Sequence, residues 1–134
     1  MAKLDKVEGI GPVYAEKLQA AGIGTTAVLL KEGGSAKGRK AIAKNTGVSE
    51  KLILEWVNHV DLFRVKGVGE EYADLLEEAG VDTVVELSKR SPGNLHEKMT
   101  AVNAEKKLVR QLPAKSQVEA WVAHAKELPR AITY

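Results

Sequence analysis

The sequence predicts an all-α protein built from two copies of one helical unit, and three observations lead to this prediction. Aromatic residues make up only 4% of the 134 residues, so the core must consist mainly of Leu, Val, Ile and Ala, which favours helices over a β-sandwich or barrel. No segment shows a sustained alternation of apolar and polar residues, so we expect no strand. Residues 7–18 align with residues 65–76 without a gap.

The repeat extends over almost the whole chain. Residues 21–23 (Ala-Gly-Ile) match residues 79–81 (Ala-Gly-Val), and Trp56 matches Trp121. The tryptophan pair is seven residues further apart than the other matched pairs, which predicts a seven-residue insertion in the second unit, between the Leu87 and Ala120 positions. We expect the matched residues to occupy equivalent places in the two units.

We expect two domains, residues 1–62 and residues 63–134, each made of about five short helices. Units of this size are close to the lower limit for independent stability, so we expect them to pack together. The connector, residues 60–65, contains no Gly, Pro or Ser, which predicts a helical junction rather than a flexible linker.

Helix signals follow one another closely in the first unit. Pro12 after Gly11 is typical of a first helical position, and Gly22 is typical of a helix end. Cap and glycine signals predict the other helices from Thr25 or Thr26 to Lys31, from Ser35 to about Asn45, and from Ser49 to about Val60.

The second unit repeats this plan with its own cap signals. Residues 83–86 and residues 116–119 both fit the capping box, which predicts Thr83 and Ser116 as N-caps. Ser91 followed by Pro92 predicts a further helix start.

Two glycine hairpins, Gly9-Ile10-Gly11 and Gly67-Val68-Gly69, are the segments most suited to binding. Two glycines around one aliphatic residue allow a tight turn, and backbone N–H groups at the following helix N-terminus suit a phosphate oxygen. A dinucleotide fingerprint is excluded, because no strand is expected before either site and a tyrosine stands where its third glycine should be.

The pattern hydrophobic-x-Gly-hydrophobic-Gly-x-x-x-Ala-x-x-Leu at residues 7–18 and 65–76 resembles the helix-hairpin-helix motif. The whole chain resembles a family of small bacterial proteins of unknown function that is built from two tandem helix-hairpin-helix-like units. The matching stretches are Glu8 to Ala15, Thr46 to Val57, Lys66 to Ala73 and Lys106 to Arg110. This resemblance implies two tandem five-helix (SAM-like) units packed together, and it implies no established activity. In the wider superfamily such hairpins commonly hold a DNA or RNA backbone through the turn amides and a nearby Lys or Arg.

The two hairpins differ in charge. Residues 66–86 contain one base, Lys66, against seven acids, and like charge at that density repels phosphate. We therefore interpret the second hairpin as structural or partner-binding, with Gly67, Val68, Gly69, Glu70 and Glu71 as its residues. The seven acids are Glu70, Glu71, Asp74, Glu77, Glu78, Asp82 and Glu86.

The first hairpin lies in the more basic half of the chain. Residues 1–64 carry ten bases and seven acids, whereas residues 65–134 carry ten bases and eleven acids. Nucleic-acid contact would use the turn Gly9, Ile10 and Gly11 with the basic cluster Lys37, Arg39, Lys40 and Lys44. A solvated helix surface is the simpler interpretation of this cluster, and the overall charge of +2 is low for a dedicated nucleic-acid binder.

The opposite charges also fit contact between proteins. The basic surface 37–44 of one molecule could dock on the acidic surface 70–86 of another, and such head-to-tail contact builds rings or chains. The partner could equally be an unknown protein, and nucleic acid stays an alternative.

Catalysis and membrane insertion find no support in the sequence. The chain has no cysteine, no metal-ligand spacing and no nucleophile elbow, and His59 and His124 follow the tryptophans as packing residues would. Its apolar stretches are short and its N-terminus lacks the apolar segment of a secretory signal, so we expect a cytoplasmic location. The prediction is a non-catalytic binding or scaffolding protein without metal or cofactor that mediates protein–protein contact. Weak, sequence-independent binding of a DNA or RNA backbone through the first hairpin is the alternative.

Overall fold

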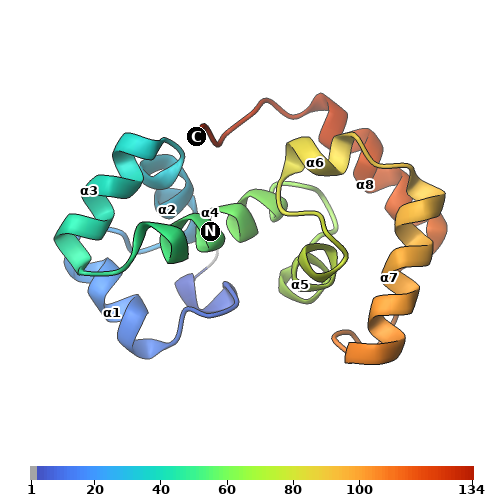
Figure 1. The fold of residues 1–134 in the computed structure, drawn as a ribbon, viewed down its shortest axis with the longest axis horizontal. Coiled ribbons are helices and arrows are strands. Elements are labelled where there is room, and N and C mark those ends of the chain that lie inside the picture. The colour runs from blue at the N-terminus through green and yellow to red at the C-terminus, as the bar shows by residue number, and fades with distance from the viewer. Residues whose placement is uncertain (1–2) are drawn as a thin grey trace. The chain divides into compact units, whose positions relative to one another are not determined.

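The computed structural model describes residues 3–134, and every regular secondary-structure element in this range is a helix (Figure 1). Within these residues the only β pairing is an isolated antiparallel bridge between Lys3 and Thr25. The all-α prediction is confirmed. The elements are the short 3-10 helix η1 (Leu4–Lys6) and the α-helices α1 (Pro12–Ala20), α2 (Thr26–Gly33), α3 (Ala36–Thr46), α4 (Glu50–Leu62), α5 (Glu70–Glu78), α6 (Val84–Ser88), α7 (Pro92–Lys106) and α8 (Lys115–Glu127).

The chain divides into two compact units. The first comprises Met1–Asp61 together with Ala131–Tyr134, and the second comprises Leu62–Arg130. The chain passes from the first unit to the second at the end of α4, and it returns to the first unit only with its last four residues. No pattern in the sequence indicated this return.

Hydroxyl side chains begin several helices where the sequence predicts them. Thr25, Ser35 and Thr83 each accept a hydrogen bond from the backbone N–H three residues later, at 3.3, 3.0 and 3.3 Å. Thr25, not Thr26, is therefore the cap of α2. Gly22 and Gly47 follow helix ends with φ of +86° and +77°, as their predicted role requires.

The predicted cap at Ser116 is wrong. Helix α8 begins at Lys115, with Ala114 in the N-cap position. The side-chain oxygen of Gln117 accepts a hydrogen bond from the Ala114 N–H at 2.7 Å, which supplies the reciprocal half of a capping box. The sequence pattern is misleading here because Gln117 fills the role that the prediction assigned to Glu119.

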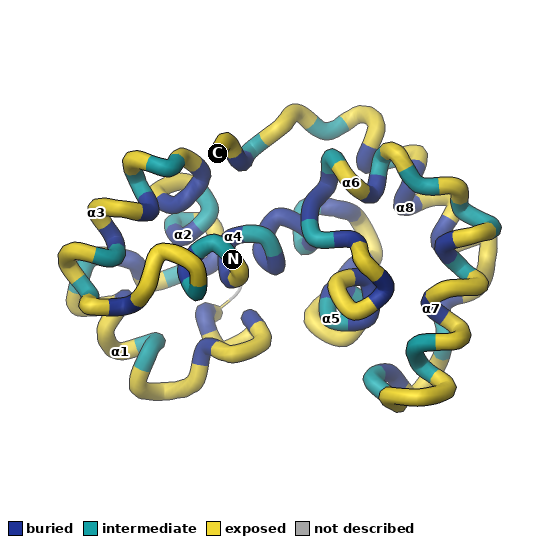
Figure 2. The backbone as a smooth tube through the Cα atoms, in the orientation of Figure 1, coloured by how far each residue is buried: buried dark blue, intermediate teal, exposed yellow. Residues whose placement is uncertain are grey.

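The first unit has a close-packed apolar core. Leu18, Leu29, Ile53 and Trp56 are at most 1% exposed, and they come from α1, α2 and α4. Gly33, at the end of α2, permits close packing against α4, because a Cβ atom there would lie 2.7 Å from Val57 Cγ2. Figure 2 shows the buried positions alternating with exposed ones along these helices.

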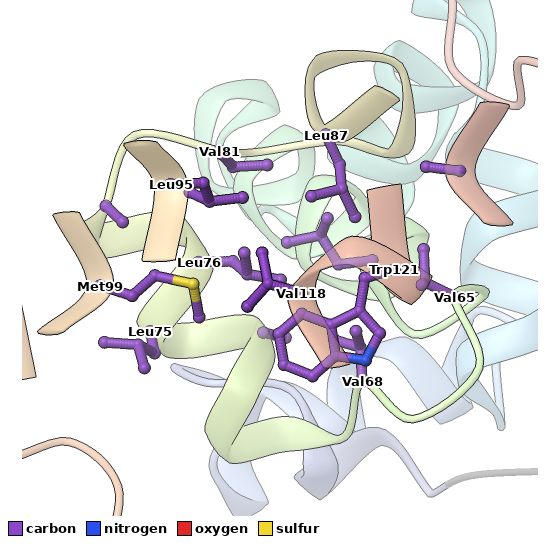
Figure 3. Packing of buried hydrophobic residues seen from close by; sticks show 14 of the residues in the cluster. Val65, Val68, Leu75, Leu76, Val81, Leu87, Leu95, Met99, Val118 and Trp121 are labelled. Carbon is purple, nitrogen blue, oxygen red and sulfur yellow. The ribbon is translucent and has the colours of Figure 1, made fainter. Parts of the chain in front are cut away.

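The second unit has a core of its own around Trp121 (Figure 3). Helix α8 packs against α6 and α7, and α7 packs against α5. The labelled side chains in Figure 3 come from each of these helices, from the turn before α5 and, with Val81, from the connection between α5 and α6. The indole of Trp121 lies beside Val68, the aliphatic residue of the second hairpin.

Matched residues make matched contacts in the two units. The rings of Tyr14 and Trp56 have centroids 5.1 Å apart, and those of Tyr72 and Trp121 are 5.2 Å apart. Gly9 and Gly67 both have φ of +92°. The prediction that the two tryptophans occupy equivalent places is confirmed by these contacts.

The extra residues of the second unit lie where the sequence predicts them. Helix α7 has 15 residues whereas α3 has 11. Residues 107–114 connect α7 to α8, whereas only residues 47–49 connect α3 to α4. The long connection is tied to α7 by Asn103, whose side chain bonds both the N–H and the carbonyl of Val109, at 3.0 and 3.3 Å.

Candidate functional site

The first hairpin is a tight turn with its aliphatic residue inside and its glycines outside. Ile10 is 4% exposed, and its N–H donates to the Val7 carbonyl at 3.1 Å. Gly9 and Gly11 are exposed. Gly11 is the N-cap of α1 and Pro12 is its first residue, so the first-turn N–H groups of α1 point out of the helix beside the turn.

A cavity of about 700 Å³ opens beside this turn. Leu4, Ile10, Pro12 and Ala15 give it an apolar wall, and Lys3 and Asp5 lie at its polar positions. Val13, in the first turn of α1, is 67% exposed. An apolar side chain of a partner fits this lining better than a phosphate group does.

The second hairpin has the same backbone conformation as the first, but different residues surround it. Val68 is 5% exposed, and its N–H donates to the Val65 carbonyl at 3.1 Å. The N–H of Lys66 donates to Nδ1 of His124 at 3.0 Å, which anchors the turn to α8. His124 is thus a structural acceptor, and its ring proton lies on Nε2 because Nδ1 accepts. Glu70 and Glu71 fill the first turn of α5, where the helix dipole favours acids.

The predicted basic cluster on α3 separates into two parts. Lys37, Lys40 and Lys44 are exposed, and their spacing places them on one face of α3. We call these three residues the lysine stripe. Arg39 is only 5% exposed and bonds two backbone carbonyls of its own unit, those of Gly33 and Thr133, at 3.0 and 2.7 Å. Arg39 is therefore not part of the exposed basic surface of α3.

The first hairpin and α3 meet α1 at different ends. A smaller cavity of about 330 Å³ lies between α3 and residues 21–23, just after the C-terminal end of α1. The hairpin precedes the N-terminal end of α1, whose nine residues span about 13 Å. Hairpin and lysine stripe are thus two separate features of the first unit.

The acidic surface follows α5 and continues to α6. Glu70, Glu71, Glu77, Glu78 and Glu86 are exposed, and Asp74 and Asp82 are half-buried. Burial, and after it the charge of Glu77, raises the pKa of Asp82. Burial and the charge of Asp82 raise the pKa of Glu86. Negative charge is therefore crowded at the C-terminal end of α5.

Cations of the second unit also lie near this surface, and the charges of Arg90 and Lys89 partly oppose the rise in the pKa of Glu86. Lys106 Nζ lies 2.5 Å from Glu78 Oε2, and the hydrogen bond to Glu78 raises the pKa of Lys106. Both side chains are more than a third exposed, so this ion pair adds little to stability.

Sequence reasoning missed the residues that hold the C-terminal segment. Gly34 accepts a hydrogen bond from the Thr133 N–H at 2.7 Å, and Arg39 binds the carbonyl of the same residue. In the sequence, the pair Gly33-Gly34 is typical only of a helix end. Nothing in the sequence indicated that these glycines also make room for a neighbouring chain segment.

Residues 3–134 bring no three His, Asp or Glu side chains together in a way that could hold a metal ion. None of the helices in this range is both long and apolar enough to cross a membrane.

The fold and these surfaces define an all-helical protein with two equivalent glycine hairpins and separate basic and acidic surfaces. The chain belongs to the family described as Domain of unknown function (DUF4332), whose model matches residues 8–128. Membership in a family of unknown function is thus confirmed, and the family's description names no activity. A bacterial origin and helix-hairpin-helix units stay predictions. No curated protein and no solved structure matches the chain.

Proposed function

We propose that this protein is a non-catalytic binding protein with tandem helix-hairpin-helix units, and that it mediates contact between proteins through its two charged surfaces. The observation that carries the proposal is the separation of charge. The lysine stripe belongs to the first unit, whereas the acidic surface on α5 and α6 belongs to the second. A second copy of this chain offers the complementary surface to each.

Contact of this kind is head-to-tail. The first unit of one molecule meets the second unit of the next, so each molecule keeps one surface of each kind available for a further neighbour. An exposed Lys–carboxylate pair contributes about 0.2–1 kcal/mol, so three pairs supply at most about 3 kcal/mol. The three pairs alone correspond to a Kd of about 6 mM at best, so an association visible at about 0.1–1 mM protein requires a further contact of about 1–2.5 kcal/mol. The exposed Val13 beside the cavity of the first unit offers an apolar addition.

Sedimentation velocity of the wild-type chain over a range of concentration and salt tests the proposal. We expect the mean mass to rise with concentration at low salt and to fall as salt screens the charges. Changing Lys37, Lys40 and Lys44 to Glu should abolish this rise. The control changes Lys17, Lys31 and Lys51, which are exposed lysines of the same unit outside the stripe, to Glu. A wild type that is monomeric at about 1 mM would refute the proposal.

A second candidate function rests on the contrast between the two hairpins. Glu70 and Glu71 follow the second hairpin in the first turn of α5, whereas the uncharged Pro12 and Val13 follow the first hairpin in the first turn of α1. The first unit could thus hold a phosphate backbone weakly, with the lysine stripe supplying charge. Three neutralised phosphates predict a log–log salt slope of about −3 for duplex DNA.

Titration of a fluorescently labelled duplex at low salt tests this second function. The stripe variant should lose binding to all duplex sequences alike, because phosphate contacts carry no base information. Lys66→Glu should change binding little, because seven acids already surround the second hairpin. Absence of duplex binding at tens of micromolar protein would exclude the nucleic-acid function.

A further inference from the structure

The segment Ala131–Tyr134, which we call the tail segment, is seated in a site on the first unit (Figure 1). The Thr133 N–H donates to the Gly34 carbonyl at 2.7 Å, and Arg39 Nη2 donates to the Thr133 carbonyl at 2.7 Å. Ile132 is only 3% exposed. The site therefore binds both backbone polar groups of one residue and buries the side chain before it, as sites for extended peptides do.

The residues that form this site are shaped for an incoming backbone. A Cβ atom at Gly34 would lie 2.6 Å from the Ala131 carbonyl oxygen and 2.9 Å from the Leu30 carbonyl oxygen of α2, so only glycine leaves room for both the segment and the end of the helix. Arg39 is 5% exposed, and its other terminal nitrogen bonds the Gly33 carbonyl at 3.0 Å, which fixes the guanidinium toward the segment. Its Cζ lies 5.8 Å from the ring centroid of Tyr134, within cation–π distance.

The tail segment is joined to the rest of the chain in a way that permits exchange. Helix α8 ends at Glu127, Leu128 is extended with φ of −83° and ψ of 137°, and Pro129 prevents the helix from continuing. The segment has only four residues, and Tyr134 is 69% exposed. A contact of this size opens readily, and it forms the same hydrogen bonds whether the segment comes from the same chain or from another.

We propose that this site, formed by Gly33, Gly34 and Arg39 between α2 and α3, is a docking site for an extended segment, and that its partner is the tail segment of a second copy of this chain. Exchange of an identical element between copies needs no new complementary surface, because the complementarity is already present within one chain. This inference does not rest on the charged surfaces, because the Gly34 backbone and the Ile132 side chain carry no charge.

Two full-length variants separate exchange between copies from contact within one chain. Gly34→Val blocks the site but keeps the tail segment, whereas Ile132→Asp keeps the site but spoils the segment. Neither variant can make the contact alone, but the segment of the first can dock on the site of the second. We expect a 1:1 complex only in the mixture, measured by sedimentation equilibrium in about 0.5 M salt, where the charged surfaces are screened. A mixture that behaves as two monomers overturns the inference.

Matched controls keep this experiment decisive. Gly24→Val adds the same side chain at an exposed glycine with nothing within 4 Å of its Cβ position, and Ala123→Asp adds the same charge at an exposed residue of α8, outside the tail segment. We expect no complex when Gly24→Val takes the place of Gly34→Val in the mixture. We also expect none when the charge control takes the place of Ile132→Asp. Gly34→Ala serves in place of Gly34→Val if the latter loses helical circular dichroism.

A peptide assay tests the site without any change at Gly34. A labelled peptide of residues 126–134 is titrated into the full-length Ile132→Asp chain, beside the same peptide carrying Asp at the Ile132 position. We expect the native peptide to bind at least tenfold more tightly than the Asp peptide, and the wild-type chain, whose site is occupied, to bind it more weakly. Equal affinity for both peptides overturns the inference, even if the charged surfaces still associate at low salt.

Discussion

The indole Nε1 of Trp121 lies 3.0 Å from the position that a Cβ atom would take at Gly67. Trp56 stands in the same relation to Gly9, at 3.4 Å. Gly67 is thus needed for two reasons, because its positive φ disfavours a side chain and because Trp121 crowds the position of a Cβ atom. At Gly9 the distance is that of an ordinary van der Waals contact, so its positive φ is the main reason for glycine. The second repeat is the tighter of the two.

Gly67→Ala should destabilise the protein by about 1–3 kcal/mol, and Gly9→Ala should cost less because its tryptophan lies further away. Gly11→Ala and Gly69→Ala are matched controls, since both glycines have negative φ and nothing within 4 Å of a Cβ atom. Urea unfolding followed by circular dichroism measures all four. A loss at Gly9, which has the same φ, as large as that at Gly67 would contradict this role of the tryptophan, and an equally large loss at the controls would contradict the need for glycine at positive φ.

Trp56→Ala should cost about 3–5 kcal/mol, because a side chain that is 1% exposed leaves a large cavity. Trp56→Phe should cost less than half as much. The indole Nε1 of Trp56 is buried without a hydrogen-bond partner among the described residues, so its removal relieves an unsatisfied donor. Thermal unfolding shifted by only a degree or two in Trp56→Ala would show that this residue is not in the core.

Stability should depend on pH through Asp82 and Glu86. Burial and neighbouring carboxylates raise the pKa of both, so the folded chain holds these protons more tightly than the unfolded chain does. Their contribution to stability is therefore greatest at low pH and is lost as pH rises through the raised pKa values. Asn does not ionise, so Asp82→Asn should remove the part of this loss of stability that comes from Asp82.

Urea unfolding near pH 7 and near pH 3 checks this expectation. The stability of Asp82→Asn relative to wild type should be higher near pH 7 than near pH 3, and Glu86→Gln should behave in the same direction. A relative stability of Asp82→Asn that is unchanged between the two pH values would contradict crowding of negative charge at this surface.

The helices could be predicted from the sequence because their signals are local. Thr25, Ser35 and Thr83 cap helices through bonds to N–H groups three residues later, and Gly22 and Gly47 mark helix ends. The equivalence of the hairpins followed from the repeat itself. The prediction of Ser116 as a cap was wrong because α8 begins earlier. Ala114 occupies the N-cap position, and its N–H bonds the side chain of Gln117.

The site could be predicted only in part, because exposure depends on contacts far apart in the chain. Arg39 has the same local setting as Lys37 and Lys40, and nothing nearby separates it from them. Its burial follows from a hydrogen bond to Thr133, a residue 94 positions away. His124 likewise acquires its acceptor role from the Lys66 N–H, 58 positions away.

Association of two charge-reversed variants tests the central claim most directly. One variant changes Lys37, Lys40 and Lys44 to Glu, and the other changes all five exposed glutamates of the acidic surface to Lys, which are Glu70, Glu71, Glu77, Glu78 and Glu86. Each alone then carries like charge on both surfaces, whereas a mixture of the two restores opposite charge at every head-to-tail contact. Sedimentation velocity at low salt and about 0.1–1 mM protein should show each variant as a monomer and the equimolar mixture as an assembly. A mixture that stays monomeric, or variants that associate alone as strongly as wild type, would contradict docking through these charged surfaces.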